Sequence, residues 1–325
     1  MASTSPTPAP PATFPLIREI NDSVPLRMYY EHFQRETRPV RKRFHNGQRK
    51  LFMAEFEFLS MCISNNTLDC TYHVIYAGSA PGNHIPLLVH FFPQVRFILY
   101  DPNIHRLNNS QFNIPSTHFE IHQRRFDDTE AHGLRKRFDQ YSNDQPPHRV
   151  LFISDIRSTK PADPLAENKI LQDMSSQMAW HSIIRPYKSM LKFRPTYSTY
   201  CIENRSSLMS YLQGTRKNQI WAPLHSTECR LIVDQDAPIV QYDYVTHESQ
   251  MFYVNTVIRH VHHALPIQGI DHIYRHAYDD VAEVSVILEY IAKFLPHVTT
   301  DQERAGIILH IHALITSACQ RRWIP

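Results

Sequence analysis

Short apolar segments recur along the chain at intervals typical of an alternating α/β protein. The segments HVIYAG (73–78), RFILYD (96–101) and RVLFISD (149–155) are rich in β-branched or aromatic residues, and each ends on glycine or aspartate. A stretch of helical length separates each segment from the next. Strands that are buried on both faces read as continuous apolar runs, so this pattern predicts a doubly wound, mostly parallel sheet.

Helical periodicity flanks these strands. Between Gln48 and Ser64 apolar residues recur at three- and four-residue intervals, which predicts a helix before the first strand, expected at 73–77. Two later strands are expected at Tyr200–Ile202 and Cys229–Val233. Beyond about Glu248 the pattern becomes helical, and the expected helices are Met251–Ala264, Asp279–Phe294 and Asp301–Cys319.

The composition divides the chain into three parts. Residues 1–15 are rich in Pro, Ser, Thr and Ala, so a disordered tail is expected there. Residues 16–245 are expected to form the main α/β domain with a basic N-terminal segment, and residues 246–325 a helical extension packed on the same domain. No run approaches the roughly 18 uncharged apolar residues of a membrane-spanning helix, so we expect a soluble intracellular protein.

The net charge is only +3, but basic residues cluster in one stretch, namely Arg35, Arg38, Arg41, Lys42, Arg43, Arg49 and Lys50. Such a run is either a solvated face or a contact for a polyanion. The five cysteines form no C-x-x-C pair, and the histidines between 260 and 276 match no simple zinc spacing. We therefore expect neither a disulfide framework nor a metal site.

Glycine is scarce, with 7 residues in the chain, so its positions are informative. Gly78 and Gly82 lie in the turn YAGSAPG, directly after a predicted strand and before a helical stretch near His84. Such a turn lets the backbone approach a ligand closely. Asp101 ends the next strand, where a carboxylate could accept hydrogen bonds from a ribose diol. Together these features favour a nucleotide-type cofactor over an incidental tight turn. Asp155 ends the third strand, where taken alone it is better explained as a helix cap.

Five short segments resemble one known family when they are taken in order. They are Gly47-Gln48-Arg49-Lys50, the turn 78–82, the segment 153–158, Leu191-Lys192-Phe193 and the segment STECRL at 226–231. This ordered set resembles the poxvirus-type cap-specific nucleoside 2′-O-methyltransferases, which in poxviruses double as the poly(A) polymerase regulatory subunit. The similarity runs from about Asn46 to near Cys319. It implies a Rossmann-like, S-adenosylmethionine-dependent methyltransferase with flanking helices and a helical C-terminal extension.

The resemblance also implies a catalytic tetrad formed by Lys50, Asp155, Lys192 and Glu228. Methyl transfer from a sulfonium to a hydroxyl is an in-line displacement, which needs a base and precise alignment but no metal. Lys192 is the expected base, because a lysine that lies near another cation such as Lys50, and is partly removed from water, loses its proton more readily. Asp155 and Glu228 are expected to orient the two ammonium groups. Ordinary surface ion pairs are the alternative.

The resemblance implies further site residues and includes Gly78, Gly82 and Asp101, which the turn and the strand end had already indicated. The side expected to bind S-adenosylmethionine comprises Gln48, Tyr76, Gly78, Ser79, Gly82, His84, Asp101 and Arg157, with Asn103 and Asp127 at positions where the residue types differ from the family. For the cap, the expected aromatic residues are Tyr29, Tyr30 and Tyr197, and the expected carboxylate is Glu248. Core packing is an open alternative for Tyr197. The residues expected to hold the RNA backbone are Arg41, Lys42 and Arg43.

Three functions remain distinguishable. The first is methylation of the 2′-hydroxyl of the first transcribed nucleotide of capped RNA. The second is methylation of internal ribose positions, and the third is an RNA-binding processivity subunit for a viral poly(A) polymerase. The expected partners are capped RNA and either a poly(A) polymerase catalytic subunit or other viral mRNA-processing proteins, with no membrane. The resemblance alone places the protein in the cytoplasm of an infected cell or in a virion.

Overall fold

A computed structural model describes residues 15–27, 47–66, 68–107, 109–141, 144–159, 166–197, 206–224 and 226–319. Its central feature is a seven-stranded sheet in the order β3-β2-β1-β4-β5-β8-β7. The bounds of these strands are β1 (Thr71–Ala77), β2 (Val95–Tyr100), β3 (Phe119–His122), β4 (His148–Ser154), β5 (Lys188–Phe193), β7 (Thr215–Lys217) and β8 (Cys229–Asp234). This sheet confirms the predicted α/β class.

The strand directions determine which chain ends meet at one edge. β3, β2, β1, β4 and β5 run parallel to their neighbours, whereas β8 is antiparallel to both β5 and β7. The carboxyl ends of the parallel strands and the beginning of β8 therefore lie at the same edge. A separate two-stranded antiparallel sheet pairs β6 (Leu208–Leu212) with β9 (Ile239–Asp243).

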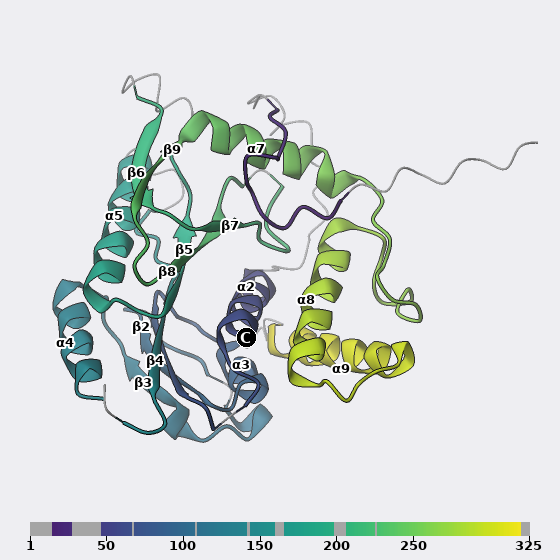
Figure 1. Cartoon of the computed structure of the whole chain (residues 1–325), viewed down its shortest axis with the longest axis horizontal. Helices are drawn as coiled ribbons and strands as arrows, with labels where there is room; N and C mark the ends of the chain where they lie inside the picture. Colours follow the sequence, from purple (N-terminus) through teal and green to yellow (C-terminus); the bar gives the residue numbers. More distant parts are fainter. Residues whose placement is uncertain are drawn as a thin grey trace, which may run out of the picture.

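Helices cover both faces of the central sheet. Figure 1 shows α4 (Asp128–Asp139) and α5 (Ala166–Ile184) on one side, and α2 (Gly47–Cys62), α3 (Ile85–Phe91), α8 (Tyr278–Phe294) and α9 (Asp301–Cys319) on the other. On this second side α2 contacts α3, α8 and α9, so the C-terminal helices pack directly on the helix that precedes the first strand. No helix in the described ranges is long and apolar enough to span a bilayer.

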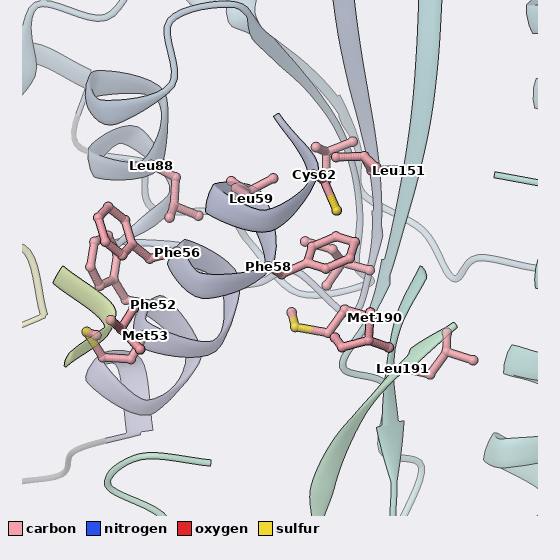
Figure 2. Packing of buried hydrophobic residues seen from close by; sticks show 14 of the residues in the cluster. Phe52, Met53, Phe56, Phe58, Leu59, Cys62, Leu88, Leu151, Met190 and Leu191 are labelled. Carbon is pink, nitrogen blue, oxygen red and sulfur yellow. The ribbon is translucent and has the colours of Figure 1, made fainter. Parts of the chain in front are cut away.

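Helix α2 is buried on two sides, as Figure 2 shows. Phe58 and Cys62 point toward the sheet residues Leu151 and Met190, while Phe52 and Phe56 point toward the neighbouring helices. Full burial of each large apolar side chain contributes about 1.5–3 kcal/mol, so this double contact fixes the helix firmly. The mixed periodicity of its apolar residues follows from packing on both sides.

Several predicted bounds need correction. The first helix ends at Cys62 rather than Ser64, and α7 spans Tyr244–Thr256 rather than 251–264. The earlier start has a local cause, because the Asp243 side chain caps the helix by accepting a hydrogen bond from the Val245 N–H at 3.1 Å. The 3₁₀ turn Ile258–His260 follows this helix. The last two helices lie within one residue of their predicted bounds.

Some sequence predictions lie outside the described residues, and some strands were not anticipated. The expected strand Tyr200–Ile202 and nearly all of the expected tail, residues 1–15, fall outside the described ranges. The strands β3, β5, β6, β7 and β9 were not predicted, because they are short or carry charged residues that break the apolar pattern. The division into a domain of residues 16–245 and an extension of residues 246–325 remains a prediction.

Candidate active site

Four charged side chains converge at the edge where β4, β5 and β8 meet. Lys50 lies in the first turn of α2, Asp155 follows β4, Lys192 lies near the end of β5, and Glu228 precedes β8. The pairing register sets Lys192 opposite Arg230 across the antiparallel strands. Sequence positions that span 178 residues are brought together because these strand ends share one edge of the sheet.

The four charged residues form two ion pairs. The Lys192 Nζ lies 2.9 Å from Asp155 Oδ1 and donates to the Asp155 carbonyl at 3.1 Å. The Lys50 Nζ lies 3.1 Å from Glu228 Oε1. Each lysine is thus paired with one carboxylate, and the catalytic role that the resemblance implies for these pairs stays a prediction. Lys192 is the more buried lysine, with a side chain 9% exposed against 19% for Lys50.

A buried arginine that the sequence reasoning missed lies beneath the four residues. Arg230 Nη2 lies 2.7 Å from Asp155 Oδ1, and its Nε donates to Gln219 Oε1 at 2.9 Å. Gln219 in turn donates to Glu228 Oε1 at 3.1 Å. Arg230 therefore links both carboxylates. Its place in the sequence was a signal, because Arg230 is the second residue of β8 and lies only two positions after Glu228.

The site carries an excess of positive charge. Arg157 Nη2 also lies 2.8 Å from Glu228 Oε2, so Lys50, Lys192, Arg157 and Arg230 surround two carboxylates. Burial lowers the pKa of Lys192, and the charges of Arg157 and Arg230 lower it further, against the opposing effect of Asp155 and Glu228. Arg157 and Arg230 are thus two cations that lower this pKa, where the sequence analysis had named Lys50 as an example of such a cation.

The two carboxylates stay ionised despite their burial. Burial raises the pKa of Asp155, but Lys192 and Arg230 outweigh this effect and bring it to about 2. The pKa of Glu228 is likewise held well below its ordinary value by Lys192 and Lys50, against the effect of burial. Burial thus weakens the hold of Lys192 on its proton, while both carboxylates remain charged.

The glycine turn after β1 packs against the segment that carries Asp155. Gly78 has φ of +82°, and a Cβ atom there would lie 2.9 Å from both the Asp155 carbonyl carbon and the Ile156 nitrogen. Gly82 has φ of +67°. Both positions require glycine because L side chains rarely adopt this conformation. The close contact at Gly78 is thus with the backbone of Asp155 and Ile156, and it places the turn directly beside the charged cluster.

Asp101 organises this same turn. It is 7% exposed, and its carboxylate accepts hydrogen bonds from the Ala80 N–H at 3.1 Å and the Asn103 N–H at 2.8 Å. The Ser79 hydroxyl lies 2.8 Å from His105 Nε2. Asp101 and Ser79 hence shape the loop through protein contacts, and the carboxylate retains unused acceptor capacity. Asp127, which like Asn103 differs in residue type from the family, caps α4 by accepting a hydrogen bond from the Glu130 N–H at 3.0 Å.

Three residues expected on the cofactor side are tied together by a carboxylate that the sequence did not single out. Glu55 on α2 accepts from the Tyr76 hydroxyl at 2.6 Å and pairs with His84 Nε2 at 2.7 Å. The other ring nitrogen of His84 lies 2.8 Å from Gln48 Oε1. Glu55 is fully buried. The network fixes Gln48, Tyr76 and His84 relative to the helix that carries Lys50.

The structure describes two of the expected cap residues, Tyr197 and Glu248. The Tyr197 ring is stacked by the Arg194 guanidinium, 4.3 Å from its centroid, and its N–H donates to Glu167 Oε2 at 3.3 Å. Glu248 is 3% exposed on α7, so it lies within the protein rather than on an open surface. The remaining cap and RNA candidates lie outside the described residues, namely Tyr29, Tyr30, Arg41, Lys42 and Arg43.

The described part of the chain contains no group of three or more His, Cys, Asp or Glu side chains arranged to hold a metal ion. Four of the five cysteines, Cys62, Cys70, Cys229 and Cys319, lie in the described ranges, and all four are free thiols.

Comparisons with known proteins find one family model and several viral relatives. A family model described as "Poly A polymerase regulatory subunit" matches residues 17–284. A protein of Fowlpox virus (strain NVSL), named cap-specific mRNA (nucleoside-2′-O-)-methyltransferase, is 33% identical over 225 residues, which is 66% of this chain and 68% of that protein. Proteins of the same name from Myxoma virus strains Lausanne and Uriarra are each 30% identical over 66% of this chain and 62% of their own length.

Among solved structures, a bluetongue virus VP4 structure described as a multifunctional RNA-capping production line aligns with a TM-score of 0.40. The alignment has 13% sequence identity and covers 61% of this chain and 33% of that chain.

Proposed function

Because this chain belongs to the poly(A) polymerase regulatory subunit family, we propose that it is a cap-specific mRNA 2′-O-methyltransferase. The proposed methyl donor is S-adenosylmethionine, and the proposed acceptor is the 2′-hydroxyl of the first transcribed nucleotide of capped RNA. The names of the fowlpox and myxoma relatives support this activity. The observation that carries the proposal is the buried Lys192, held by Asp155 within an excess of positive charge.

The chemistry requires a base for the hydroxyl and alignment of the reacting atoms. When bound, S-adenosylmethionine supplies a methyl group on a positively charged sulfur. Lys192 in its neutral form would accept the proton of the 2′-hydroxyl, so that the ribose oxygen could take the methyl group and leave a neutral thioether behind. Asp155 holds the Lys192 amine in place, and Glu228 does the same for Lys50. The excess positive charge also attracts the RNA phosphate backbone.

The residues at the ends of β1 and β2 fit the proposed methyl donor. The turn from Gly78 to Gly82 has two left-handed glycines, so its backbone can approach a ligand without a side chain in the way. Asn83 Oδ1 and His105 Nδ1 are buried beside this turn and have no hydrogen-bond partner in the described ranges. Buried polar atoms normally find partners, so these two are candidates for contact with a ligand.

The family description also supports a second candidate, an RNA-binding subunit of a poly(A) polymerase. Such a tether needs a basic surface but no buried lysine with a weakened proton affinity. The complete set of Lys50, Asp155, Lys192 and Glu228 favours the enzyme, and both roles are compatible in one chain. For either role the proposed location is the cytoplasm of an infected cell or a virion.

A pair of lysine variants on the same strand tests the proposal. Lys192→Ala removes the proposed base, whereas Lys188→Ala removes a lysine at the start of β5 that pairs with Asp234 at the other end of the sheet. Methyl transfer to capped RNA should fall by at least about 10²-fold in the first variant and stay nearly unchanged in the second. The affinity for S-adenosylmethionine should change little in either. Equal transfer rates for the two variants would refute the role of Lys192.

A further inference from the structure

The face of α5 that packs against the sheet carries a polar stripe where apolar residues are expected. Asp173, Gln177 and His181 recur every four residues, so they lie on one face of the helix, and all are 8% exposed or less. Their partners are on the sheet side: Asp173 accepts from the Ser158 N–H at 2.9 Å, and His181 Nδ1 lies 2.7 Å from Ser189 Oγ. Burial of polar side chains at a helix–sheet interface is costly unless each is paired, so the stripe calls for an explanation.

The middle residue of the stripe contacts the backbone of the proposed base. The Lys192 N–H donates to Gln177 Oε1 at 3.1 Å, and Gln177 Nε2 donates to the Lys192 carbonyl at 3.1 Å. One carboxamide therefore satisfies both polar groups of a single peptide position. Gln177 is 1% exposed, so water does not compete for these bonds.

The need for this contact follows from the strand register. The pairing of β4 with β5 ends at Ser154 and Leu191, one residue before Lys192. After Ser154 the chain leaves β5, since the Asp155 N–H donates to the Ala77 carbonyl on the β1 side at 2.9 Å. This divergence brings the Asp155 carboxylate to the site, but it leaves the Lys192 backbone without a strand partner on that side. Gln177 supplies the two hydrogen bonds that a further β4 residue would have made.

We propose that Gln177 is a positioning residue that clamps the Lys192 backbone and so sets the place of its amine in the proposed active site. This inference rests on the proposed methyltransferase function. Asp173 extends the same arrangement to the segment after β4, because it binds both the N–H and the hydroxyl of Ser158, three residues beyond Asp155. α5 thus holds the two strand ends that deliver Lys192 and Asp155.

The consequence of losing the clamp is a misplaced base rather than a missing one. Displacement of a reacting group by about 1 Å can slow a reaction by about 10²-fold. Gln177→Met has a similar volume and removes both hydrogen bonds. It should lower the single-turnover rate of methyl transfer by about 10–100-fold, with less than about threefold change in the affinity for S-adenosylmethionine or in the KM for RNA.

Three readouts separate this role from simple support of the fold. The Lys192 amide, measured by hydrogen exchange, should exchange about tenfold faster in Gln177→Met than in the parent. The pH midpoint of transfer should move upward, because a less tightly held lysine is less buried. Gln177→Glu keeps an acceptor for the Lys192 N–H and, when protonated, a donor for the Lys192 carbonyl. Its transfer rate should therefore be at least about fivefold higher than that of Gln177→Met. Gln172→Met, at an exposed position of the same helix, is the matched control and should match the parent.

Each outcome decides a separate question. Unchanged exchange at Lys192 in the Gln177→Met variant, or an unchanged rate in a parent that transfers methyl groups, overturns the clamp. A parent that transfers no methyl group overturns the proposed function, while the exchange measurement still decides whether Gln177 holds the Lys192 backbone. If Gln177→Met does not fold, Gln177→Asn takes its place, because a carboxamide one methylene shorter cannot reach both polar groups of Lys192. Unchanged exchange of the Lys192 amide in that variant counts against the clamp.

Discussion

Replacement of Glu283 by glutamine is predicted to destabilise the protein by about 3 kcal/mol at pH 7. Glu283 lies on α8 and is fully buried. Its carboxylate accepts hydrogen bonds from Arg49 Nε at 2.8 Å, Trp221 Nε1 at 2.7 Å and the Tyr274 hydroxyl at 2.8 Å. Glutamine keeps the shape of the side chain, but it leaves the Arg49 guanidinium buried without its counter-charge.

The pKa of Glu283 and the usual cost of breaking a buried ion pair point to the same magnitude. Removal of one partner from a buried ion pair typically costs about 3–5 kcal/mol. The pKa of Glu283, which burial would raise, is brought from an ordinary 4.5 to about 2 by His312 and Arg49. Since one pKa unit corresponds to about 1.4 kcal/mol, this difference amounts to about 3 kcal/mol of stability from the ionised form.

The same pKa predicts how the effect depends on pH. A carboxyl group whose pKa is lower in the folded state stabilises the fold above its unfolded value of 4.5, and this contribution is lost as the pH falls toward 2. The stability difference between the parent and Glu283→Gln should therefore shrink by about 2 kcal/mol between pH 7 and pH 3.

Urea unfolding at both pH values measures this difference. Asp139→Asn serves as the control, because Asp139 is 55% exposed in a surface pair with Arg135 and should contribute at most about 0.5 kcal/mol. A loss below about 1 kcal/mol for Glu283→Gln at pH 7, or a loss that does not shrink in acid, contradicts the reasoning.

Two further predictions concern the glycine turn and the proposed base. Gly78→Ala should weaken both cofactor binding and methyl transfer, because the new Cβ would lie 2.9 Å from the Asp155 backbone. Gly133→Ala, on the exposed face of α4, meets no atom within 4 Å and should stabilise the protein by about 0.5–1 kcal/mol. Calorimetric titration measures the binding of the cofactor, and urea unfolding measures the stability of both variants. The transfer rate should rise with pH to a midpoint below the ordinary lysine pKa of 10.5, because burial lowers the pKa of Lys192; a pH–rate profile checks this, and a midpoint at or above 10.5 would contradict it.

Strand-end residues were the part of the site that the sequence could place. Asp101 and Asp155 each follow an apolar strand of a parallel sheet, so their position at one edge follows from the fold class. Lys192 was located only through the family motif, because β5 has lysines at two of its six positions and does not read as a buried strand. Its place at the edge became clear from the register with β4 and β8.

The supporting residues could not be predicted because they are polar side chains on buried helix faces. Glu55 and Gln177 look like solvent-facing residues of amphipathic helices when only the sequence is considered. Each is buried because one specific partner group satisfies it, the Tyr76 hydroxyl and His84 for Glu55 and the Lys192 backbone for Gln177. Such partners are distant in the chain, so hydrophobic periodicity contains no signal for them.

The position of the transferred methyl group on the RNA distinguishes the cap 2′-O-methyltransferase from its alternatives. The parent protein is incubated with labelled S-adenosylmethionine and short RNAs that carry a 7-methylguanosine cap, an unmethylated guanosine cap or no cap, and the products are digested to nucleosides. We predict label on the 2′-oxygen of the first transcribed nucleotide, only with the methylated cap. Label at internal riboses, or no label despite measurable binding of RNA and S-adenosylmethionine, would contradict the account and favour the internal-ribose enzyme or the RNA tether, respectively.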